Sequence, residues 1–154
     1  MRIGFFTGSY PGVNGFGGIG TYTRTMARAL AARGHQVHVL TAGDGQQEVL
    51  DGQVVVHTVR IAHFPALDRA LPGLGACFRV GAAMRRLAAR ERLHVVEFPN
   101  WEGLGLFYIA RPVTPVCVRL STSAAETVSI DGIPWTRALR WDVRRERWSA
   151  RLAG

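Results

Sequence analysis

A glycine-rich segment from Gly15 to Tyr22 has the residue types and the spacing to bind a phosphate group. Four of the six residues from 15 to 20 are glycine, and the segment lies between an apolar run, 3–7, and an amphipathic run, 19–33. Glycines allow positive φ angles and leave no Cβ between main-chain N–H groups and a ligand. A helix that begins directly after them adds unpaired N–H donors and a partial positive charge. The order of strand, glycine loop and helix therefore favours a phosphate or diphosphate site over a flexible turn.

Three kinds of phosphate-binding loop compete for this segment. A Walker A loop needs a lysine, and the chain contains none, which excludes it. A dinucleotide fingerprint is matched by letter at Gly15, Gly17 and Gly20, but its first glycine should follow the strand directly. Here residues 8–14 intervene, with Pro11 among them. The third kind is a longer and wider loop that admits a ligand from another domain, and residues 8–14 supply that length.

Polar residues around 97–102 form a second candidate site. Glu97 and Glu102 suggest an acid–base pair of the kind that glycosidases use. The intervening residues include a proline, so the spacing does not show whether the two carboxylates meet. The alternative is structural: Glu97 caps the end of a strand and Trp101 packs under the loop.

Hydrophobic periodicity predicts an α/β domain in which strands alternate with helices. Strands are expected over 2–7, 35–42, 53–61, 93–98 and 115–120, helices over 19–33, 75–91, about 99–110 and 134–154, and a loop over 62–75. This alternation is typical of a mainly parallel sheet with helices on both faces. Ligands bind such sheets beyond the carboxyl ends of the strands. The segments expected to converge there are 8–20, 42–44, 97–102 and 120–123.

Composition indicates one globular domain without a nucleic-acid partner. Of the 154 residues, 47% are hydrophobic and 19% are charged, and the net charge of +8 comes from arginines that form no recognisable nucleic-acid-binding module. Cys77 and Cys117 have apolar neighbours and no Cys-x-x-Cys spacing, which predicts buried free thiols. Histidines and carboxylates show no metal-ligand spacing, so no metal site is expected. Free thiols and the lack of a signal-peptide pattern or a long apolar run indicate a cytoplasmic protein.

Three features of the N-terminal third of the chain occur in a characteristic order. They are Ser9-Tyr10-Pro11, Gly17-Gly18-Ile19-Gly20-Thr21-Tyr22, and Arg33-Gly34-His35 followed by the apolar run 37–41. Together they resemble the N-terminal opening of family 4 glycosyltransferases, and the resemblance extends over the whole chain. Members of that family are retaining, metal-independent GT-B enzymes whose co-substrate is a nucleotide sugar, so no further cofactor is expected. The resemblance implies a Rossmann-like three-layer domain, 1–154, which is the N-terminal, acceptor-side half of a GT-B fold.

The resemblance also implies roles for the candidate residues. Gly17, Gly18 and Gly20 would offer N–H groups to the donor diphosphate, which gains charge as the sugar bond breaks. The residues assigned to acceptor binding are Asn14, Glu97, Asn100, Trp101, Glu102 and Thr122. Ser121 stands at the catalytic position, where family members commonly carry a histidine. Serine donates a hydrogen bond but, unlike that histidine, holds no positive charge near neutral pH.

A GT-B enzyme needs a second Rossmann-like domain, which holds most contacts to the nucleotide sugar and which this sequence does not contain. We therefore expect this domain to be inactive alone. The intact enzyme would transfer a hexose, with retention, to a sugar, lipid-linked or small-molecule acceptor. One alternative is a dinucleotide-binding module in which Asp44 binds a ribose. The other is a non-catalytic half that assembles with a separate donor-binding subunit.

The last predicted helix has a basic stripe. Arginines recur there at spacings of three and four residues, at 137, 140, 144, 147 and 151. An apolar row of Trp141, Trp148 and Leu152 lies beside the stripe, which suits peripheral contact with an anionic membrane. The alternative is that a second apolar row, Trp135, Leu139 and Val143, packs on the sheet while the tryptophan row packs against the second domain.

Overall fold

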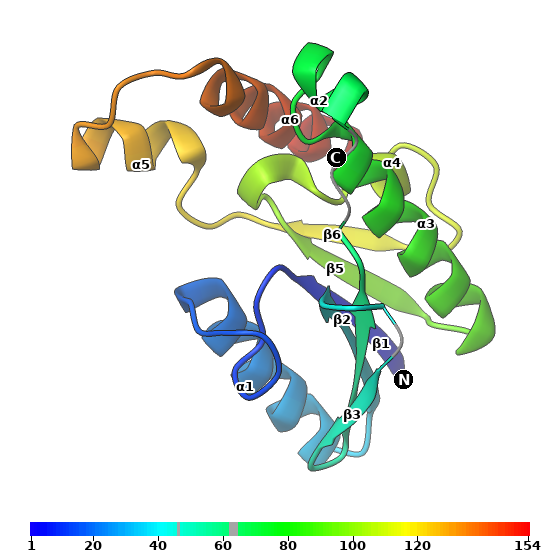
Figure 1. Cartoon of the computed structure of the whole chain (residues 1–154). Helices are drawn as coiled ribbons and strands as arrows, with labels where there is room; N and C mark the ends of the chain where they lie inside the picture. The colour runs from blue at the N-terminus through cyan, green and yellow to red at the C-terminus, as the bar shows by residue number, and fades with distance from the viewer. Residues whose placement is uncertain (46, 62–64) are drawn as a thin grey trace.

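The computed structural model describes residues 1–45, 47–61 and 65–154, with only the backbone described at 65 and 66. These residues form a six-stranded sheet in the order β3-β4-β2-β1-β5-β6 (Figure 1). The strands are β1 (Arg2–Thr7), β2 (Gln36–Ala42), β3 (Glu48–Asp51), β4 (Val54–Val59), β5 (Val95–Pro99) and β6 (Val116–Arg119). Neighbouring strands are parallel except β3 and β4, which are antiparallel.

Helices connect the strands and cover both faces of the sheet. They are α1 (Gly18–Ala32), α2 (Pro65–Ala70), α3 (Leu74–Arg90), the 3-10 turn η1 (Trp101–Gly103), α4 (Leu106–Ile109), α5 (Ala124–Asp131) and α6 (Arg137–Ala153). Figure 1 shows α1 on one side of the sheet and α3 on the other. The predicted Rossmann-like three-layer α/β fold is therefore confirmed.

The alternation of side chains along β1 creates the two halves of the core. Phe5 belongs to the cluster that includes Ala27 and Ala31 of α1, whereas Phe6 belongs to the cluster that includes Val80 and Met84 of α3. Successive side chains of a strand point to opposite faces, so a central strand needs apolar residues at nearly every position. The apolar side chains on one face of β1 bury α1 against the sheet, and those on the other face bury α3. This packing fixes the positions of the loops at the carboxyl edge of the sheet.

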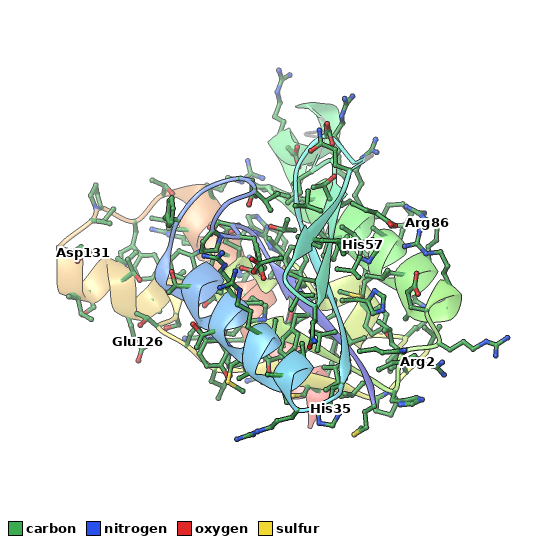
Figure 2. All side chains as sticks on the ribbon, turned by 90° about the horizontal axis from the view of Figure 1, so that it is seen from below. Arg2, His35, His57, Arg86, Glu126 and Asp131 are labelled. Atoms are coloured by element: carbon green, nitrogen blue, oxygen red, sulfur yellow. The ribbon has the colours of Figure 1, made fainter. Side chains whose placement is uncertain are left out.

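β3 and β4 form an antiparallel hairpin joined through Gly52, whose φ is +64°, as the turn signals Asp44-Gly45 and Asp51-Gly52 indicate for this region. Two other elements differ from those expected. Residues 65–70, expected to be loop, form α2, while residues 62–64 lie outside the described part. Residues 124–131 form α5, which has a complete capping box between Ser123 and Glu126. Figure 2 labels Glu126 and Asp131 on this helix, which stands at one side of the molecule.

The prediction of two buried thiols is right for Cys77 and wrong for Cys117, which is exposed. Cys117 lies on β6, the last strand of the sheet, while its neighbours Val116 and Val118 pack against the α3 side. Alternation turns Cys117 to the other face, where α1 packs mainly on β1, β2 and β4 and leaves Cys117 exposed.

The last helix, α6, buries polar residues and exposes apolar ones. Arg145, Glu146 and Ser149 are buried, whereas Trp148 and Leu152 are exposed. The expectation that Trp135 packs on the sheet is wrong: α6 begins at Arg137, and Trp135, in the segment before it, is 49% exposed. Val143 is buried as expected.

Candidate functional site

The carboxyl ends of β1, β5 and β6 border a cleft of about 660 Å³. β1 has β2 on one side and β5 on the other, so the cleft lies where the strand order reverses. Open α/β sheets bind ligands at this place. The cleft brings together six of the residues predicted from the sequence, namely Gly17, Gly18, Trp101, Glu102, Ser121 and Thr122. Asn14, Gly20, Glu97 and Asn100 are not part of its lining.

The start of α1 forms one wall of the cleft. Gly17 is extended, with φ 177°, and α1 begins at Gly18 with no side chain capping its first turn. The first N–H groups of a helix have no intrahelical partner, so those of Gly18 and Ile19 remain available as donors. A Cβ at Gly18 would meet nothing within 4 Å, so this backbone is open towards the cleft.

Gly20 and Asn14 shape the loop from behind. A Cβ at Gly20 would lie 2.3 Å from the carbonyl oxygen of Ser9, so close packing requires glycine there. The Asn14 side chain accepts a hydrogen bond from the Tyr10 N–H at 2.6 Å and donates one to the Gly8 carbonyl at 2.9 Å. Gly20 and Asn14 therefore help to fix the conformation of the loop. Ligand contacts by these two residues stay predictions.

Asn100 connects the ends of β5 and β6. Its side chain is buried, and its Oδ1 accepts hydrogen bonds from both the main-chain N–H and the hydroxyl of Ser121, each at 2.8 Å. The Ser121 hydroxyl donates its one hydrogen to Asn100. Towards the cleft, the Ser121 oxygen therefore acts as a hydrogen-bond acceptor. Asn100 thus positions Ser121 and does not line the cleft itself.

The turn η1 holds Glu102 in the cleft wall. Glu102 has a left-handed backbone, with φ 57°, which is uncommon for a residue other than glycine and is found at functional sites. Glu146 of α6 accepts a hydrogen bond from the Glu102 N–H at 3.0 Å, and Nε of Arg145 donates to the Glu102 carbonyl at 2.9 Å. Burial, assisted by nearby Asp142, raises the pKa of the Glu102 carboxyl above its usual value. The buried polar face of α6 therefore fixes this turn.

Sequence reasoning did not identify Arg119, which lines the same cleft. Its Nε lies 3.0 Å from Oε1 of Glu97, and its guanidinium group stacks on Tyr22 of α1 at 4.1 Å from the ring centre. Burial raises the pKa of Glu97, while the hydrogen bond and charge of Arg119 act in the opposite direction. Glu97, predicted to bind the acceptor, is thus occupied by Arg119.

The segment 42–44 does not reach this cleft, contrary to expectation. Asp44 accepts hydrogen bonds from Gln47 and Thr58 and lines a separate hollow of about 1320 Å³ between β4 and α3. Figure 2 labels His57 and Arg86, which belong to the lining of that hollow. A dinucleotide site would need Asp44 beside the glycine loop, so the structure does not favour that alternative.

Two negative observations apply to the part of the chain that the structure describes. No group of three or more His, Cys, Asp or Glu side chains in it is arranged to hold a metal ion. None of its helices combines the length and the apolar composition needed to cross a membrane.

The chain belongs to the family of glycosyl transferase 4-like domains, whose model matches residues 17–154. Sucrose-phosphate synthase from Thermosynechococcus elongatus has a similar structure, with a TM-score of 0.64 and 15% identity over 98% of this chain and 39% of that chain. The catalytic domain of starch synthase IV from Arabidopsis thaliana, solved with ADP and acarbose, matches with a TM-score of 0.55 and 13% identity over 81% of this chain and 36% of that chain. No match was found among curated proteins.

These comparisons confirm the family that the three sequence features together indicated, and the Rossmann-like fold of a GT-B half. The chain spans only 39% and 36% of the two proteins of similar structure. At these identities the likeness shows the fold alone.

Proposed function

We propose that this chain is the acceptor-side domain of a glycosyltransferase that moves a sugar from a nucleotide sugar to a sugar, lipid-linked or small-molecule acceptor. The observation that supports it best is the composition of the cleft. The uncapped start of α1 supplies N–H donors from one element, while Glu102 and Ser121 supply oxygen acceptors from two others. A diphosphate matches the first group and sugar hydroxyls match the second.

The two walls suggest a division of roles. Gly17 and Gly18 bind the donor diphosphate, where N–H groups stabilise the charge that develops as the sugar bond breaks. Trp101 offers an apolar ring surface for a sugar, and Glu102 and Thr122 accept or donate hydrogen bonds to acceptor hydroxyls. Transfer of a hexose with retention, at a cytoplasmic site and without a metal or further cofactor, is the form of the reaction we propose by analogy with the family.

A second domain or a separate subunit would complete the site. This chain covers less than half of each protein of similar structure, so those proteins have further parts that this chain does not match. We therefore infer that most contacts to the nucleotide come from a donor-binding domain, and that the isolated chain transfers no sugar. Detection of transfer from any nucleotide sugar by the purified chain would contradict this inference.

The exposed face of α6 supports a proposal about a further partner, an anionic membrane surface. Arg140, Arg144 and Arg147 are exposed on this helix, and the guanidinium group of Arg144 lies 5.3 Å from the ring centre of Trp141. Exposed Trp148 lies beside Trp141, at 6.2 Å between ring centres. Basic and aromatic side chains together favour the surface of an anionic bilayer.

The experiment that tests the main proposal is an NMR titration of the isolated chain. UDP should shift the amide resonances of Gly17 and Gly18, and methyl glucoside should shift those of Glu102 and Thr122. NAD is the comparison ligand for the dinucleotide alternative. Shifts confined to other parts of the chain, or a response to NAD but not to UDP or methyl glucoside, would show that the proposal is wrong.

A further inference from the structure

Arg119 is a cationic side chain of the cleft whose role no sequence motif indicates. It ends β6 and lines the cleft together with Gly17, Gly18 and Ser121. Its side chain is only 17% exposed, so the guanidinium group is largely shielded from water. An arginine stays charged when buried, so the cleft carries a permanent positive charge beside the glycine loop.

Two contacts fix the orientation of this guanidinium group. Glu97 accepts a hydrogen bond from Nε at 3.0 Å, and the ring of Tyr22 covers one face at 4.1 Å. Both partners come from elements packed in the core, Glu97 from β5 and Tyr22 from α1. Arg119 is therefore held in place before any ligand binds, which lowers the entropic cost of using it for recognition.

The terminal end of the guanidinium group is incompletely paired. Glu97 is bonded through Nε, whereas a carboxylate that paired bidentately would occupy two nitrogens. Among the described residues, the buried Nη2 has no hydrogen-bond partner. Buried donors without a partner are rare in folded proteins, and an anion that binds beside Arg119 would give this one a partner.

We propose that Arg119 is an anion-binding residue of the cleft that holds a phosphate group together with the N–H groups of Gly17 and Gly18. This rests on the proposed function for the place of the ligand and adds the chemistry of its recognition. The phosphate belongs either to the donor diphosphate or to a phosphorylated acceptor, since both would enter the same cleft. Glu97 is then a positioning residue, which orients Arg119 and moderates its charge.

The test compares four variants with the wild-type chain in NMR titrations. Arg119→Gln removes the charge, and Arg119→Lys keeps it but removes the planar fork. Glu97→Gln keeps the shape of the positioning residue and removes its negative charge. Arg111→Gln is the matched control, because Arg111 is exposed in the turn that leads into the start of β6, at the opposite end of the strand. The probes are inorganic pyrophosphate, glucose 6-phosphate and uncharged glucose.

We expect Arg119→Gln to weaken binding of pyrophosphate or of glucose 6-phosphate about tenfold, and Arg119→Lys to weaken it less. The probe that loses affinity identifies the source of the phosphate. Glu97→Gln should strengthen binding, because it removes a competing negative charge, whereas a purely structural ion pair would make this variant bind more weakly. Arg111→Gln should bind like the wild type. Thermal unfolding of each variant checks that the chain is folded under the conditions of the titration.

Equal phosphate affinity in the wild type and Arg119→Gln would overturn the proposal, as would the absence of phosphate binding in the wild-type cleft. Glucose separates this failure from a failure of the proposed function. In one outcome, glucose shifts the resonances of Glu102 and Thr122 equally in all chains while phosphate affinity does not depend on Arg119. That result would support the proposed sugar-binding function and contradict the proposed role of Arg119.

Discussion

Gly20 and Ser9 pack so closely that a Cβ at Gly20 would lie 2.3 Å from the carbonyl oxygen of Ser9. Gly18, only two residues earlier in the same helix, has no heavy atom within 4 Å of its Cβ position. The two glycines therefore serve different purposes, although the sequence motif presents them alike. Close approach of two backbone segments accounts for Gly20, while the open surface of Gly18 accounts for access of a ligand.

This difference predicts opposite behaviour of two variants. Gly20→Ala should lower the free energy of unfolding by about 1–3 kcal/mol, because the Ser9 backbone must move. Gly18→Ala should change it by less than about 0.5 kcal/mol and should weaken UDP binding, because its methyl group enters the cleft. Urea unfolding and NMR titration measure the two effects. Comparable destabilisation by both substitutions would show that Gly18 is also a packing residue.

Asp51 forms an ion-pair cluster that ties the β3–β4 hairpin to α1 and to the loop after β1. It accepts hydrogen bonds from the Tyr10 hydroxyl at 2.8 Å and from Arg24 at 3.0 Å, and it pairs with Arg28. Hydrogen bonds from the arginines, above all Arg24, hold the pKa of Asp51 well below its usual value. Asp51→Asn should therefore cost about 2–3 kcal/mol of stability at neutral pH.

The pH dependence of this effect has a defined sign. A carboxyl whose pKa is lowered by folding contributes stability that is complete above its unfolded pKa, about 3.9, and is lost as the pH falls further towards the folded value. The stability difference between the wild type and Asp51→Asn should thus shrink below about pH 4. Asp131→Asn, at an exposed position on α5, is the control and should unfold like the wild type. A difference that stays constant down to pH 2 would contradict the assignment.

The sequence predicted the fold wherever local patterns determine structure. The buried β1, the amphipathic α1 and the glycine loop between them were all expected, because apolar periodicity and glycine spacing are properties of contiguous residues. The helix α5 was missed although Ser123 and Glu126 have the spacing of a capping box. The apolar residues of α5 do not recur clearly on one face, so hydrophobic periodicity did not indicate this helix either.

The cleft was predicted only in part, because its remaining contacts join distant parts of the chain. Arg119 meets Glu97 across two neighbouring strands and Tyr22 from α1, and no local spacing indicates either contact. The same holds for Asn100, whose side chain is used to fix Ser121. The polar face of α6 was likewise unexpected, because a hydrophobic pattern cannot show that Arg145 finds carbonyl and carboxylate partners in the interior.

His38 and His57 predict a second, separate pH dependence. Their ring nitrogens are 3.1 Å apart on β2 and β4, and both side chains are buried. Burial lowers both pKa values, opposed in part by Glu91 near His38 and by Glu48 near His57, while Arg90 beside the pair lowers them further. The folded chain therefore keeps these histidines neutral at pH values where the unfolded chain binds protons.

Stability should consequently be complete above the unfolded histidine pKa, about 6.5, and should fall as the pH decreases below it. His57→Gln should reduce this loss between pH 7.5 and pH 5.5, measured as the urea concentration at the midpoint of unfolding. His94→Gln is the control, because His94 is exposed. If the His57→Gln and His94→Gln chains lose stability equally over this range, the buried pair is not its source.

The exposed face of α6 gives the last prediction, binding to anionic vesicles. Replacing Arg140, Arg144 and Arg147 with glutamine should reduce co-sedimentation with vesicles of phosphatidylcholine and phosphatidylserine. Each arginine near such a surface contributes about 1 kcal/mol, so the triple variant should bind more than about a hundredfold more weakly. Salt should weaken the wild-type interaction in the same direction, because the charges are exposed.

The matched control changes the same number of charges elsewhere. Arg86, Arg92 and Arg111 are exposed and lie outside α6, so their replacement with glutamine keeps the net charge of the α6 variant but leaves the helix intact. This control should bind vesicles nearly as well as the wild type. Equal losses in both triple variants would mean that net charge alone drives binding. Equal binding to neutral and anionic vesicles, or none at low salt, would exclude the membrane contact and leave Trp148 and Leu152 as a surface for a protein partner.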